Sequence, residues 1–222
     1  MQKNYWNSSL AVGRYDFSHS TETDSYIKVA NSIIKNFEPG DRILELACGT
    51  GILTNFILEK NTVPIQYLAT DFSPNMIDKC RQKNSHVQFE VADAKDLEFD
   101  AKSFDHIIIA NALHIMPHPE KALSEIGRVL QDDGTLFAPN WLKPTDMREK
   151  IVLRLASLFG YNVHNSFELE AYLTFLEANG FKITEKEVYS CVRELLFVAC
   201  KKSDQSSIFD GAIQQPGKSL NK

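Results

Sequence analysis

The chain has 222 residues, of which 43% are hydrophobic and 24% charged, as in an ordinary globular protein that buries a sizeable core. Its 24 Lys and Arg residues against 29 Asp and Glu residues give a net charge of −5, which speaks against a nucleic-acid partner. Four scattered cysteines form neither a disulfide framework nor a zinc pattern, and we expect no metal. Without a signal-peptide pattern or an apolar run near the ~18 residues of a membrane span, the composition favours a reduced, cytoplasmic protein.

The two ends of the chain differ in composition from its middle. Residues 1–24 are polar with scattered aromatic side chains, which predicts an N-terminal arm that packs on the rest as a lid. Residues 203–222 contain serine, glutamine, glycine and proline, which predicts a flexible tail. Residues 25–202 carry regular apolar patterns and are expected to form one domain.

Within that domain, apolar runs alternate with helical patterns. A first helix is expected at 26–37, where apolar residues recur at helical spacing before Pro39 and Gly40. Short apolar runs predict strands at 43–46, 67–69, 87–91, 106–110, 135–138, 181–183 and 195–200, and helices are expected at 52–59, 75–83, 120–130 and 168–179. The alternation predicts an α/β fold with a Rossmann-like, doubly wound, seven-stranded, mostly parallel sheet and an antiparallel last strand.

Two segments depart from strict alternation. Residues 141–165 form an extra segment with apolar residues at helical spacing after the fifth expected strand. Because sheets of this kind bind ligands at their carboxyl edge, this insert is predicted to be a substrate lid. The last two expected strands have no helix between them, which predicts an antiparallel hairpin.

The most specific pattern is a glycine loop between the first strand and the helix that follows it. The apolar strand that begins at Ile43 runs into Gly49 and Gly51, and glycine lets the backbone approach a ligand closely. Twenty residues after Gly51, Asp71 follows the second strand. A carboxylate at that place accepts hydrogen bonds from the two adjacent hydroxyls of a ribose. Loop and acid together predict a cofactor that contains a nucleoside.

Two side chains near the loop indicate the kind of cofactor. Thr54 stands where a dinucleotide-binding loop has its third glycine or an alanine, and Glu45 lies just upstream of the loop. A carboxylate repels a pyrophosphate but attracts an ammonium or sulfonium group, so a cationic cofactor is favoured over NAD. The alternative for Glu45 is a buried acid at a strand end, satisfied by backbone groups.

The segment Glu45-Leu46-Ala47-Cys48-Gly49-Thr50-Gly51 resembles, almost letter for letter, the first motif of the class I S-adenosylmethionine-dependent methyltransferases. Three further motifs, around Asp71, Asp93 and Asn111, resemble that family in order over about residues 40–140, and the pattern is most similar to the ubiquinone/menaquinone-type and natural-product methyltransferases. The resemblance implies S-adenosylmethionine as cofactor, S-adenosylhomocysteine as product, and the class I fold. It implies cofactor contacts from Glu45, Ala47, Cys48, Gly49, Thr50, Gly51, Asp71, Phe72, Ser73, Met76, Asp93, Ala94, Asn111, Leu113 and Tyr15.

The resemblance also implies roles for single residues. Asp71 would bind the ribose, Asp93 the adenine amino group, and Glu45, indirectly, the ammonium of the methionine moiety. Cys48 is expected to pack beside the cofactor rather than to act as a nucleophile.

Methyl transfer from a sulfonium is an in-line displacement, which depends on alignment more than on a catalytic side chain. His114 follows the fourth strand and is the candidate base, and the alternative is a rim histidine that packs or caps. Trp6 in the arm and Trp141 and Phe159 in the insert are predicted, with His114, to contact the substrate. For Tyr15, contact as part of the lid and simple packing remain equally open.

No recognition domain or basic face for a macromolecular substrate is visible in the sequence. The expected acceptor is therefore a small organic molecule, methylated at oxygen, nitrogen or carbon, and the chain is expected to be a monomer or homodimer. Two alternatives remain open: an NAD-linked oxidoreductase and a non-catalytic partner protein that binds S-adenosylmethionine.

Overall fold

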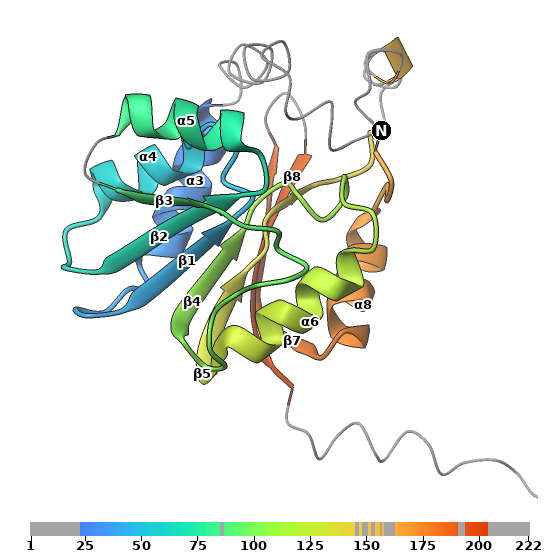
Figure 1. The fold of residues 1–222 in the computed structure, drawn as a ribbon. Helices are drawn as coiled ribbons and strands as arrows, with labels where there is room; N and C mark the ends of the chain where they lie inside the picture. Colours follow the sequence, from blue (N-terminus) through green and yellow to red (C-terminus); the bar gives the residue numbers. More distant parts are fainter. Residues whose placement is uncertain are drawn as a thin grey trace, which may run out of the picture.

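The computed structural model describes residues 23–84, 87–144, 147, 151, 154, 155, 157, 163–190 and 194–203 (Figure 1). The predicted arm and tail lie outside these residues except for Thr23, Asp24 and Ser203. In chain order the elements are α3 (Thr23–Ile34), β1 (Arg42–Leu46), α4 (Ile52–Lys60), β2 (Gln66–Asp71), α5 (Pro74–Lys83), β3 (Gln88–Val91), β4 (Phe104–Ile109), α6 (Pro119–Val129), β5 (Leu130–Phe137), β6 (Asn140–Trp141), α8 (Leu169–Ala178), β7 (Phe181–Ser190) and β8 (Glu194–Lys202).

The described strands form one mixed sheet. Strands β3, β2, β1, β4 and β5 lie side by side in this order and are all parallel. The last strand, β8, is antiparallel to β5, β6 and β7. This arrangement confirms the predicted α/β class, the parallel majority and the antiparallel last strand.

The strand count differs from the expected seven because the fifth strand is interrupted. Both β5 and β6 pair with β8, through Phe137 opposite Ala199 and Asn140 opposite Leu196. The break falls at Pro139, which has no backbone N–H to donate to a neighbouring strand. The described sheet therefore has eight strands, and β6 continues the path of β5 along β8.

The start of β5 also differs from the sequence prediction, which extended the preceding helix to Leu130 and began the strand at residue 135. The helix ends at Val129, and Leu130 already pairs with Phe104 of β4. The pairing register shifts between Phe104 and His106, so the turn-like sequence before Gly134 is accommodated as an irregularity within the strand. A Cβ at Gly134 would lie 2.8 Å from the carbonyl oxygen of Asp105, which explains why glycine stands there.

The hairpin predicted for the last two strands is confirmed, and it is longer than the apolar runs indicated. Strand β7 extends from Phe181 to Ser190, and its outer half is mostly exposed, with only Tyr189 buried, so it forms no apolar run in the sequence. None of the described helices has the length and apolar character needed to cross a membrane.

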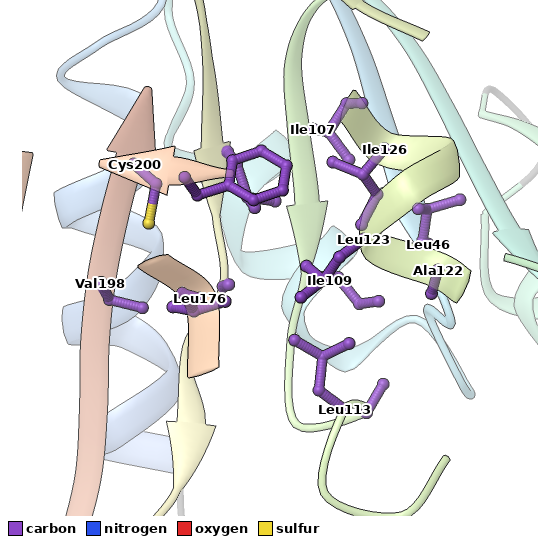
Figure 2. Packing of buried hydrophobic residues seen from close by; sticks show 14 of the residues in the cluster. Leu46, Ile107, Ile109, Leu113, Ala122, Leu123, Ile126, Leu176, Val198 and Cys200 are labelled. Carbon is purple, nitrogen blue, oxygen red and sulfur yellow. The ribbon is translucent and has the colours of Figure 1, made fainter. Parts of the chain in front are cut away.

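Two large hydrophobic clusters cover the two faces of the sheet, and a smaller third one lies beside α5. Because side chains alternate along a strand, Ile107 and Ile109 pack on the face under α6 and α8, while Ile43 and Ile108 pack on the face under α3 and α4. Figure 2 shows the first cluster, in which Leu123 of α6 lies against Ile109 of β4. Both faces are thus buried, and the loops at the strand ends remain available for a site.

Candidate functional site

A pocket of about 890 Å³, which includes space open to solvent, lies beyond the carboxyl ends of the parallel strands. It is near the central strand β1, where the strand order reverses between β2 and β4, the usual place for a ligand in such sheets. Its lining is Ala47, Gly49, Asp71, Phe72, Met76, Ala92, Asp93, Ala94, Lys95, Ala110, Asn111, Ala112, Ile115, Met116 and Pro117.

The glycine loop forms one wall of this pocket in an unusual backbone conformation. The φ angles are positive at Ala47 (54°), Gly49 (58°) and Gly51 (78°), and Gly51 is the residue before α4. A Cβ at Gly51 would lie 3.1 Å from the Sγ of Cys80 in α5. Two backbone N–H groups tie the loop to β2: Cys48 donates to the carbonyl of Thr70 at 2.9 Å and Gly49 to the carboxylate of Asp71 at 3.0 Å.

Asp71 joins the loop to the pocket. Its Oδ2 accepts from the N–H of Gly49, and its Oδ1 accepts from the N–H of Ser73 at 2.9 Å. Burial raises the pKa of this carboxyl to about 6, although both backbone hydrogen bonds act in the opposite direction. Each carboxylate oxygen retains acceptor capacity beyond one hydrogen bond, so Asp71 can take donors from a ligand.

Glu45 lies behind the loop and does not line the pocket. Its side chain is buried, and its Oε2 accepts from Thr54 at 2.5 Å and from the hydroxyl of Tyr67 at 2.8 Å. The partners are thus side-chain hydroxyls rather than the backbone groups of the alternative reading. Burial raises the pKa of Glu45 to about 7, and the nearby charge of Asp71 acts in the same direction.

The next wall carries Phe72 and Met76 after β2, and Asp93 and Ala94 after β3. Ser73 does not line the pocket: its Oγ accepts from the N–H of Met76 and so caps helix α5. Lys95 places its Nζ 3.5 Å from Oδ1 of Asp93, and both residues line the pocket. Among the described residues, no group of three or more His, Cys, Asp or Glu is arranged to hold a metal ion.

Several other residues predicted for the site lie behind its walls. Cys48, Thr50 and Gly51 belong to the loop but do not line the pocket. The neighbouring thiol of Cys80 and burial hold the pKa of Cys48 well above its usual value, which disfavours the reactive thiolate. Leu113 packs in the first core cluster (Figure 2).

His114 and Trp141 are not brought to the pocket either. The Nδ1 of His114 lies 2.9 Å from Oδ1 of Asn140, and only 4% of the residue is exposed. Since Asn140 donates its amide to the carbonyl of Trp141, its Oδ1 is the acceptor and His114 Nδ1 the donor. Trp141 is buried in the second core cluster, edge-on to Tyr26. Trp6, Tyr15 and Phe159 lie outside the described residues.

Most of one wall of the pocket was not predicted from the sequence. Asn111 was predicted, but Ala112, Ile115, Met116 and Pro117, which follow β4, also line the pocket. Lys95 was missed as well, although it directly follows Asp93 and Ala94, two residues that the third motif indicated. Small and apolar residues after a strand are common in any turn, so no residue type marked this wall.

Residues 43–134 match the sequence profile of a protein family described as "Methyltransferase domain". These residues include β1 except Arg42, β2 to β4, α6 and the whole pocket lining. The chain is similar to this family over that range. It is 34% identical over 139 residues to a demethylmenaquinone methyltransferase of Clavibacter sepedonicus, a match that covers 61% of this chain and 56% of that protein. The chain thus spans little more than half the length of that relative.

Solved structures show the same fold. Magnesium protoporphyrin IX methyltransferase from Synechocystis PCC 6803, solved with bound S-adenosylhomocysteine, superposes with a TM-score of 0.69 at 16% identity, covering 90% of this chain and 98% of that one. The cyclase SpnF superposes with a TM-score of 0.64 at 18% identity, covering 80% of this chain and 81% of that one. Since one of these neighbours is named as a cyclase, the shared fold does not by itself decide the reaction.

Proposed function

We propose that the protein transfers the methyl group of S-adenosylmethionine, by in-line displacement, to an oxygen, nitrogen or carbon nucleophile of a small organic molecule, and releases S-adenosylhomocysteine. The observation that carries the proposal is the Asp71 carboxylate, which lies in the pocket and holds the glycine loop through Gly49. A methyltransferase domain with this loop and acid matches an adenosyl cofactor, because the acid accepts from the ribose hydroxyls while the loop brings the backbone close.

The charges around the pocket support a cationic cofactor. Asp71 and Asp93 line it, Glu45 is buried behind it, and Lys95, the one cation among the lining residues, lies against Asp93. This balance suits the ammonium and sulfonium of S-adenosylmethionine and is unfavourable for a pyrophosphate. It therefore argues against the NAD-linked alternative.

We further propose that Asp71 binds the ribose and Asp93 the adenine amino group, with Phe72 and Met76 beside the adenine. Glu45 acts on the methionine ammonium only indirectly, since it is behind the loop. The remaining predicted contacts of the loop, Cys48, Thr50 and Gly51, would act through their backbone. These assignments follow the family resemblance and the pocket lining together.

Catalysis in this proposal rests on positioning. Alignment of the nucleophile with the methyl group lowers the activation barrier by up to ~7–11 kcal/mol in ideal cases. A base increases the rate further only where the acceptor must lose a proton. His114 would serve as that base only if the acceptor reached it, because the residue is buried behind the wall.

We propose a small acceptor that is at least partly apolar, since Ala112, Ile115, Met116 and Pro117 form an apolar wall. The demethylmenaquinone methyltransferase relative supports an acceptor of this general kind. We also propose a cytoplasmic monomer or homodimer, and the free thiols of Cys48, Cys80 and Cys200 fit a reducing compartment.

Isothermal titration with S-adenosylmethionine, S-adenosylhomocysteine and NAD tests the cofactor. We expect both adenosyl compounds to bind and NAD not to bind. Asp71→Asn should weaken the binding of both adenosyl compounds. Asp78→Asn, which changes an exposed carboxylate on helix α5, should leave their binding unchanged. Binding of NAD without a response to the sulfonium compound would overturn the proposal.

A further inference from the structure

The pocket wall between β4 and α6 is a tight turn with little regular structure of its own. Residues 111–117 contribute Asn111, Ala112, Ile115, Met116 and Pro117 to the pocket lining. Within the turn, the N–H groups of Ile115 and Met116 both donate to the carbonyl of Ala112, at 3.0 and 3.1 Å. These short-range bonds shape the turn but do not attach it to the rest of the domain.

On its inner side the turn is attached by the side chain of Leu113, which is fully buried in the core near Ile109 (Figure 2), and by the bond from His114 Nδ1 to Asn140 Oδ1. Asn165 attaches the turn on the outer side. The backbone N–H of Asn165 donates to the carbonyl of His114 at 2.9 Å. Its side-chain Nδ2 donates to the carbonyls of Met116 at 3.1 Å and Leu113 at 3.4 Å.

The residue type suits this arrangement. An asparagine amide offers two N–H donors, which match the two carbonyl oxygens of Leu113 and Met116. Aspartate has the same shape, but as a carboxylate it has no donor and would place negative charge against those oxygens. Asn165 thus holds the carbonyls of Leu113, His114 and Met116 in one turn. It lies 52 positions from Leu113 in the sequence.

Asn165 also lies at the base of the segment that leaves the sheet after β6. The N–H of Lys143 donates to the carbonyl of Phe167 at 2.8 Å, and its Nζ lies 2.9 Å from Glu168 Oε1, so the two ends of residues 143–167 are joined. The closing end of this segment is therefore the part that holds the pocket wall.

We propose that Asn165 is a positioning residue: its hydrogen bonds to the turn at 113–116 fix the wall against which S-adenosylmethionine and its acceptor are held, and they join that wall to the base of the segment 143–167. The identity of the ligand in this inference rests on the proposed function. The inference that Asn165 positions the wall is independent of it, because the hydrogen bonds are present in the chain without ligand.

Two variants and a matched control test the inference. Asn165→Ala removes both side-chain donors and keeps the backbone bond, and Asn165→Asp keeps the shape but exchanges the donors for acceptors. Asn179→Ala is the control, because Asn179 Nδ2 also donates to a backbone carbonyl, that of Phe175 at 2.7 Å, at the end of α8. Hydrogen exchange of the amides at 111–117 and the affinity for S-adenosylhomocysteine are measured on all four proteins.

We expect faster exchange at 111–117 in both Asn165 variants, and a weakening of S-adenosylhomocysteine binding by about tenfold, the scale of one or two neutral hydrogen bonds, with Asn165→Asp the weaker binder. The control should lose stability without either effect. Unchanged exchange of the turn and unchanged affinity in Asn165→Ala would overturn the inference. If the unmodified protein binds no adenosyl compound, the proposed function fails, and the exchange of the turn alone decides whether Asn165 positions it.

Discussion

Two walls of the same pocket are built in different ways. The glycine-loop wall is held by backbone groups and one acid near in sequence: Gly49 bonds Asp71, and Cys48 bonds Thr70. The opposite wall, residues 111–117, is held by Asn140 and Asn165, which belong to later parts of the chain. The wall proposed for the cofactor is thus specified locally, and the wall proposed for the acceptor is specified by long-range contacts. A change in the loop should therefore act most strongly on cofactor affinity, and a change behind the turn should act on the order of that wall and more weakly on affinity.

The largest effect is expected at Asp71. Asp71→Ala removes the acceptor for both loop and ligand, and we expect S-adenosylmethionine affinity to fall by at least about a hundredfold, as when hydrogen bonds to a charged group are lost. In the unmodified protein, affinity should fall as the pH is lowered through about 6, because burial raises the pKa of this carboxyl and the ligand needs its ionised form. Calorimetry at pH 5 to 8 measures both. Retained affinity in Asp71→Ala would remove the acid from the cofactor site.

The next largest effect, on the pH dependence of stability, is expected at Glu45, which lies behind the loop. Its pKa is raised from 4.5 to about 7, so its contribution to the unfolding free energy is fully present below about pH 4.5 and is lost as the pH rises through about 7. The size is on the order of 3 kcal/mol. Glu45→Gln should therefore be more stable than the unmodified protein at pH 8. Its unfolding free energy should also fall less between pH 5 and pH 8.

Denaturant unfolding at several pH values measures this effect. The exposed Glu59 on α4 supplies the control Glu59→Gln, which should leave the pH dependence unchanged. The same pH dependence in Glu45→Gln as in the unmodified protein would show that this buried acid is ionised at little cost.

A smaller effect is expected at Gly51. Gly51→Ala places a Cβ 3.1 Å from Cys80 Sγ at a φ of +78°, and we expect a loss of about 1–3 kcal/mol in unfolding free energy together with weaker cofactor binding. Gly40→Ala is the control: its φ is +97°, but nothing lies within 4 Å of the added Cβ, so it carries the backbone strain alone. Equal losses in the two variants would mean that contact with α5 plays no part in shaping the loop.

The smallest effect on binding is expected at His114. His114→Ala removes the bond to the buried Asn140, which should cost about 1–3 kcal/mol of stability. Cofactor affinity should change little, since the ring does not line the pocket. Once an acceptor is known, a lost pH dependence of turnover in this variant would bring His114 back as the base.

Sequence patterns indicated the glycine-loop wall because its parts are close together along the chain, and Ala47, Gly49 and Asp71 do line the pocket. Glycines, a strand and Asp71 fall within about 30 residues, and each leaves a recognisable residue type. The other wall could not be predicted in this way. Ile115 and Met116 look like ordinary turn residues, and the bonds to Asn165 become visible only when the chain is folded.

Trp141 is a residue that the sequence predicted for the site but that the structure places elsewhere. As an aromatic residue after the fifth strand it fitted a pocket roof, but it forms part of β6 and is buried against Tyr26. The sequence could not show that β5 resumes after Pro139 and carries this side chain into the core. Apolar character marks burial, whereas the side of the sheet on which a residue is buried depends on strand pairing.

Methyl transfer itself is tested by incubating the protein with S-adenosylmethionine labelled in its methyl group, together with a small-molecule extract. Mass spectrometry of the products should find the label on a small organic molecule, with S-adenosylhomocysteine formed in equal amount and both absent in Asp71→Ala. A protein that binds S-adenosylmethionine tightly while the label stays on the cofactor would contradict the account and indicate a non-catalytic binding protein or a different reaction on the same fold.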